Sequence, residues 1–92
     1  MGYHIMQPRF PLGDVFATSG AMGLGEDLTP FLYRHHCGDW SVLDDEDKQT
    51  NEDALEAGSR ILSCYVTESG GRLYVITEAD RSRTTILLAS EY

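Results

Sequence analysis

Long apolar runs, cysteines and basic residues are all scarce in this chain of 92 residues. No apolar run approaches the roughly 18 residues that span a bilayer, so we expect no transmembrane helix. Residues 1–15 lack a charged segment followed by an apolar one, so no signal peptide is expected either. Two cysteines, Cys37 and Cys64, in a chain without an export signal are usually free thiols, which predicts a cytoplasmic protein.

The length limits the chain to one domain with a modest core. It leaves no room for a cofactor-binding α/β domain, and the glycine motif of such a domain is missing. Hydrophobic residues make up 41% of the chain, which predicts a folded protein rather than a disordered one.

Basic residues are outnumbered, since seven Lys and Arg face fifteen Asp and Glu for a formal charge of −8. Residues 39–56 hold eight acids and one base, Lys48, and so carry −7, whereas the remaining seven acids and six bases carry −1. Phosphate repels carboxylate, so we expect this block to meet a basic partner and not nucleic acid directly. The alternative interpretation is a solvated helix face that keeps the protein soluble.

The first half of the chain predicts an arm, a short strand and a helix. Residues 1–11 read as a flexible arm because Pro8 and Pro11 each remove a backbone donor. Residues 12–18 alternate weakly, as a short strand or extended segment would, and the glycine-rich stretch that follows predicts one or two helical turns. Thr29 as N-cap and Pro30 after it predict a helix over 30–37.

The second half predicts a helix over 45–58, begun by Asp44 or Asp45, and then three strands. The hydrophobic period changes to two at residue 62, and turn signals separate strands at 62–68, 72–78 and 84–89. We therefore predict a single α+β domain over 12–92, with two to three short helices followed by a three-stranded antiparallel β-meander. The expected core consists of Phe31, Trp40, Leu55, Leu62, Val75, Ile86 and Leu88.

The string RHHCGDW at residues 34–40 raises the possibility of a metal or catalytic site. Successive helical residues point about 100° apart, so His35, His36 and Cys37 cannot converge on one ion. A nucleophilic pair of Cys37 and His36 would need the thiol and imidazole within hydrogen-bond reach. We interpret the string as a helix end with Trp40 packed into the core, and expect no metal, no cofactor and no enzymatic activity.

A second polar cluster, TEADRSRTT, occupies residues 77–85. Turn formation around Asp80 and threonine pairing across strands explain most of it. A turn that binds a partner through Asp80 and Arg81 is the alternative, and a catalytic acid group of Glu78, Asp80 and Arg81 is a further one.

Three segments resemble one family of small proteins carried by plasmids, phages and integrated elements. They fit R-H-x-x-G-D-W at 34–40, N-x-x-A-L-x-x-G-x-R-x-L-S-x-Y at 51–65, and I-T-E-A-D-R-S-x-T-T-x-L-L-x-x-E-Y at 76–92. Members of this family are often labelled "plasmid-related protein" or type I restriction enzyme subunit, and the chain is too short for the second activity. The resemblance covers residues 12–92, departs at Gly23 and Gly25, and implies a mobile-element context without established chemistry.

Together these features predict a stoichiometric inhibitor of a nucleic-acid-targeting host defence complex, either CRISPR or restriction, that occupies a basic protein surface. The alternative is a regulatory or structural accessory protein that acts as a homodimer, and a third is a metal-dependent hydrolase or nuclease that uses His35, Asp39 and Glu78. A charge of −8 would repel a nuclease's substrate, and no membrane partner is expected. The predicted partner-binding residues are Asp44, Asp45, Glu46, Asp47, Glu52, Asp53, Glu56, Asp80 and Arg81.

Overall fold

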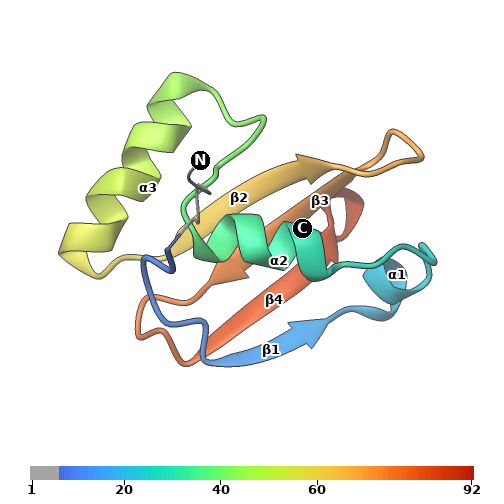
Figure 1. Ribbon diagram of the computed structural model, residues 1–92, viewed down its shortest axis with the longest axis horizontal. Coiled ribbons are helices and arrows are strands. Elements are labelled where there is room, and N and C mark those ends of the chain that lie inside the picture. The colour runs from blue at the N-terminus through green and yellow to red at the C-terminus, as the bar shows by residue number, and fades with distance from the viewer. Residues whose placement is uncertain (1–6) are drawn as a thin grey trace, which may run out of the picture.

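The computed structural model describes residues 7–92, which form one small α+β domain (Figure 1). The strands are β1 (Asp14–Ala17), β2 (Ile61–Val66), β3 (Arg72–Thr77) and β4 (Arg83–Leu88). The helices are α1 (Ser19–Met22), α2 (Thr29–His36) and α3 (Asp45–Ala57), and a 3-10 helix, η1 (Ala89–Glu91), follows β4. No helix within these residues is long and apolar enough to cross a membrane.

The sheet contains the predicted antiparallel meander and one strand more. β2 pairs with β3 and β3 with β4, so that Ile61 lies opposite Thr77 and Thr77 opposite Thr84. β1 adds in parallel to the outer edge of β4, which gives a four-stranded mixed sheet in the order β1-β4-β3-β2. The prediction of a three-stranded antiparallel sheet is therefore corrected, because the extended segment near Val15 supplies the backbone partner that the edge of β4 would otherwise lack.

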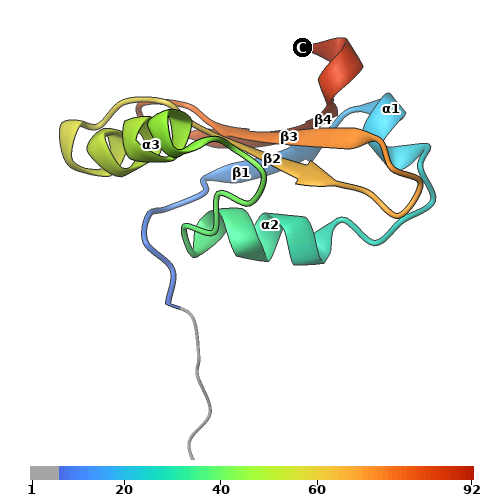
Figure 2. The same cartoon turned by 90° about the horizontal axis from the view of Figure 1, so that it is seen from above.

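The helices are distributed unevenly around the sheet. Figure 2 shows α2 covering one face, η1 rising from the other, and α3 beside the sheet rather than on either face. On the covered face, Tyr65, Leu73, Val75 and Ile86 form a buried cluster against which Phe31 of α2 packs. A second cluster joins Phe10, Trp40, Ala54 and Ile61 between α3, β2 and the N-terminal segment.

Of the predicted core, Trp40, Val75 and Ile86 are buried, whereas Phe31, Leu55, Leu62 and Leu88 are only half-buried. Leu62 differs for a reason of strand phase: Ile61, Ser63 and Tyr65 are the β2 residues that turn toward α2, and Leu62 lies on the opposite face.

The N-terminal segment belongs in part to the packed domain. Residues 1–6 of the predicted arm lie outside the described residues. Phe10 is buried, and the backbone N–H of Arg9 donates a hydrogen bond of 2.9 Å to the carbonyl of His36. The packed domain therefore extends to Arg9, before the boundary predicted at Leu12.

Helix ends follow local chemistry with one difference from expectation. The Asp44 side chain accepts from the backbone N–H of Asp47 at 2.8 Å and caps α3, which ends at Gly58 in the left-handed region with φ of 71°. Thr29 was expected as the N-cap of α2 but is its first residue, and its N–H donates to Asp27 at 3.0 Å.

Candidate functional site

Helix α3 presents four carboxylates on one side. With 100° between successive residues, Asp45, Glu46, Asp53 and Glu56 fall within about 100° of the helix circumference and along about 16 Å of its axis. We call these four residues the acidic stripe. All four are exposed, and the buried residues of α3, Asn51 and Ala54, lie on the other side.

The carboxylates of the acidic stripe lack cationic partners. Within residues 7–92, Asp45, Glu46 and Glu56 make no side-chain hydrogen bond or ion pair, and Asp53 accepts only from the amide of Gln49 at 3.0 Å. These carboxylates are therefore available to cations from outside the domain.

Helix stability explains only half of the acidic stripe. Asp45 and Glu46 lie in the first turn, where the positive end of the helix dipole favours carboxylates. Asp53 and Glu56 lie near the negative end, and no basic residue occupies the last turn. An acid there costs about 0.3–1 kcal/mol, so the stability of α3 does not account for these two residues.

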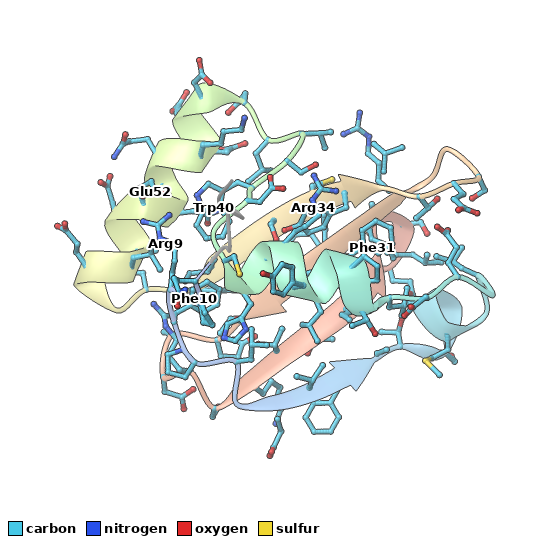
Figure 3. All side chains as sticks on the ribbon, in the orientation of Figure 1. Arg9, Phe10, Phe31, Arg34, Trp40 and Glu52 are labelled. Carbon is cyan, nitrogen blue, oxygen red and sulfur yellow. The ribbon has the colours of Figure 1, made fainter. Side chains whose placement is uncertain are left out.

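Glu52 is bound within the domain. It accepts hydrogen bonds from both terminal nitrogens of Arg9, at 2.9 and 2.7 Å, and from Nε1 of Trp40 at 2.7 Å (Figure 3). The hydrogen bonds from Arg9 and then Trp40 hold the pKa of Glu52 below its ordinary value. Three of the predicted partner-binding acids therefore have structural roles. Glu52 binds Arg9 and Trp40. Asp44 caps α3 by accepting a hydrogen bond from the backbone N–H of Asp47 in the first turn.

The predicted turn residues Asp80 and Arg81 lie against the end of α3. Arg81 donates to the carbonyls of Ala54 at 3.1 Å and Ser59 at 2.6 Å, so its guanidinium caps the C-terminal end of the helix. Asp80 accepts from the N–H of Ser82 at 2.9 Å, and hydrogen bonds from Ser82 lower its pKa. The structure therefore brings this turn to the C-terminal end of α3, where backbone carbonyls occupy Arg81.

The side chains of His35, Arg34 and Asp39 in the RHHCGDW segment bind other groups of the domain. His35 is fully buried and bonds Ser63 through Nδ1 and Thr77 through Nε2, the latter at 2.9 Å. Burial, with a smaller contribution from His36, lowers the pKa of His35 to about 3, so its ring is neutral. Arg34 pairs with Asp39 at 2.7 Å. Among the described residues, no three His, Cys, Asp or Glu side chains gather as a metal site would require.

Sequence reasoning missed two contacts that shape this site. The interaction of Arg9 with Glu52 spans 43 positions, and no periodic pattern links the two residues. The bond from Trp40 to Glu52 had one weak signal, since a buried indole N–H needs an acceptor and acids follow Trp40 in the sequence.

Comparison with protein-family models, with curated proteins and with solved structures finds no match to this chain.

Proposed function

We propose that this chain is a small acidic interaction protein that acts in the cytoplasm as a stoichiometric inhibitor of a nucleic-acid-targeting defence complex. The acidic stripe binds a basic surface of that complex and blocks the site where nucleic acid phosphates would lie. The defence target, CRISPR or restriction, follows from the resemblance to small mobile-element proteins and is part of the proposal.

A single observation supports this proposal most strongly. The acidic stripe keeps four exposed carboxylates without a cationic partner in the described part of the chain, and two of them stand where the helix dipole disfavours them. Acidic residues that cost helix stability and pair with no cation in the described part of the chain are best explained by a contact with cations outside it.

The physics of the interface follows from the spacing of the charges. Each exposed ion pair is worth at most about 1 kcal/mol, so a single carboxylate would not hold a partner. Four carboxylates on one rigid helix act together, and their field accelerates association with a basic groove. Arg81 fixes the C-terminal end of α3, and Glu52, within the helix, fixes the orientation of α3 against the N-terminal segment.

Affinity capture with matched variants tests this proposal. Wild-type protein serves as bait in lysate from a bacterium with active CRISPR and restriction systems, beside the double variants D53K/E56K and E26K/E68K. Both variants change the charge equally. The backbone N–H of Glu68 donates to the Glu26 carboxylate at 3.0 Å, and the α1–α2 loop and β2–β3 turn that carry these residues lie at the end of the domain away from α3 (Figure 1). We expect wild type and E26K/E68K to retain a nucleic-acid-binding complex and D53K/E56K to lose it.

A captured complex should also dissociate as salt rises, because exposed ion pairs are screened. If D53K/E56K captures the same complex as wild type does, the acidic stripe serves only solubility and the proposal fails.

A further inference from the structure

The two edges of the sheet are treated differently by the chain. At the β2 edge, the Asn51 side chain donates to the carbonyl of Leu62 at 2.6 Å and accepts from its N–H at 3.1 Å. The N–H of Val42 approaches the carbonyl of Cys64 at 3.5 Å on the same edge. These contacts occupy backbone groups that would otherwise pair with another strand.

The β1 edge has no such cover within residues 7–92. Asp14, Val15 and Phe16 are exposed, with 43% of Val15 and 51% of Phe16 accessible to solvent. Of the residues that commonly protect an edge, the strand carries no lysine or proline and only one charged residue, Asp14. Figure 1 shows β1 as the outermost strand, with no helix beyond it.

The orientation of the β1 backbone identifies the free groups. The N–H of Asp14 donates to Ser82 and that of Thr18 to Ile86, each at 3.0 Å, so these residues face β4. Because alternate residues turn their backbone groups to opposite edges, Phe16 also faces β4, and Val15 and Ala17 face outward. The outer edge thus offers the N–H and C=O groups of Val15 and Ala17.

We propose that this edge binds a second copy of the chain, with the two β1 strands antiparallel and Phe16 opposite Phe16. In that register Val15 and Ala17 of one chain exchange backbone hydrogen bonds with Ala17 and Val15 of the other. The two Phe16 side chains occupy a non-hydrogen-bonded pair, where side chains approach most closely. Asp14 then lies opposite Thr18, so no like charges face each other across the pair.

Charge separation allows a second copy to be the occupant despite the negative charge of each chain. The acidic stripe lies beyond β2, at the edge of the sheet farthest from β1. In the dimer the two β2 strands are seven strand spacings apart, or about 34 Å. The Debye length is about 8 Å at physiological salt, so the two acidic stripes repel each other only weakly. Pairing at β1 also leaves both acidic stripes free, so this inference does not depend on the proposed function.

Sedimentation velocity from micromolar to millimolar protein, with hydrogen exchange at both limits, tests the proposal. We expect a concentration-dependent dimer, because the five facing residues of each chain make a small interface. The amides of Val15 and Ala17 should gain protection as the dimer forms, whereas the amide of Phe16 should stay protected throughout.

Variants test the edge and the register separately. Val15→Pro removes an outward N–H at an edge position that tolerates proline, and should give a monomer. Phe16→Lys places two cations opposite each other and should also give a monomer, as should Phe16→Glu, whereas an equal mixture of the two should associate. Val66→Lys, at an apolar residue of β2 that is 46% exposed, is the control and should dimerise as wild type does.

Three results would overturn the proposal. The first is a wild-type protein that stays monomeric up to millimolar concentration, which would leave the edge to a strand from another protein. The second is dimerisation of Val15→Pro and Phe16→Lys at wild-type strength, with folding verified by circular dichroism. The third is a wild-type dimer combined with a Phe16→Lys and Phe16→Glu mixture that does not associate.

Discussion

The indole nitrogen of Trp40 donates a hydrogen bond of 2.7 Å to the carboxylate of Glu52. Arg9 donates two hydrogen bonds to the same carboxylate, and the side chain of Trp40 stacks on Phe10 with ring centroids 6.3 Å apart. One acid of α3 therefore joins the N-terminal segment, the loop after α2 and the helix itself (Figure 3). Its neighbour Asp53 has no such role, so adjacent acids in one charged block serve different purposes.

Glu52→Lys should lower the free energy of unfolding by about 1–3 kcal/mol, because Trp40 loses its acceptor and Arg9 gains a like-charged neighbour. Asp53→Lys, one residue away, should leave stability within about 0.5 kcal/mol of wild type. Urea denaturation followed by circular dichroism measures both. Equal midpoints for the two variants would show that the Arg9–Glu52–Trp40 contact contributes nothing.

Trp40→Ala should cost about 3–5 kcal/mol, the range for removing a large core aromatic. Trp40 is 4% exposed and packs with Phe10 and Ile61, so its loss leaves a cavity between α3 and the sheet. Trp40→Phe should cost less because most of the packing remains. Because Trp40 is the chain's single tryptophan, these variants lose tryptophan fluorescence, and unfolding is therefore followed by circular dichroism. Unchanged melting of Trp40→Ala would place this residue outside the core.

Asn51→Ala should destabilise the domain by about 1–3 kcal/mol, since it removes both hydrogen bonds to the backbone of Leu62 and leaves those groups unpaired. The amide of Leu62 should then exchange its hydrogen faster. Thr50→Ala, next to it on the exposed side of α3, is the control and should have little effect. If the Leu62 amide keeps its protection in Asn51→Ala, another group protects the β2 edge.

The pH dependence of stability should reflect His35. Burial lowers its pKa to about 3 in the folded protein, from an ordinary value of 6.5. Between these values the unfolded chain binds the extra proton, so stability should fall as the pH drops below about 6.5, with a slope of up to about 1.4 kcal/mol per pH unit. Nuclear magnetic resonance should show a His35 ring that stays neutral throughout this range.

His36→Gln should keep this slope, because burial is the larger cause of the lowered pKa of His35. Urea midpoints measured from about pH 7 down to about pH 5 avoid the pH range in which the carboxylates titrate. A wild-type stability that is flat over this range would contradict the buried neutral state of His35.

Most secondary structure was predictable because it rests on local signals. Asp44 and Gly58 lie at the two ends of α3, and the change of the hydrophobic period to two near residue 62 predicts the strands. The parallel pairing of β1 with β4 was not predictable, since Val15 and Thr84 are far apart in sequence and a four-residue strand carries little pattern. The phase of β2 was misjudged because Ser63 and Thr67 are polar yet buried: Ser63 bonds His35, and Thr67 bonds the β2–β3 turn.

The candidate site was predictable as a block of charge but not in its division of roles. Composition identified the acids of residues 39–56 as one block of charge. Only the tertiary structure separates Glu52, held by Arg9, from the acidic stripe. In the same way, Arg81 was expected to be available for a partner, yet it is bound to carbonyls at the end of α3.

The most direct test of the proposed inhibition is target-DNA binding by purified guide-loaded CRISPR effectors and type I restriction enzymes, measured with one equivalent of this protein. We predict that at least one complex loses DNA binding with wild type and with E26K/E68K but keeps it with D53K/E56K. The D53K/E56K variant should remain folded, since both changes place positive charge at the negative end of α3. Undiminished DNA binding by every complex, or equal inhibition by D53K/E56K, would contradict the central role of the acidic stripe.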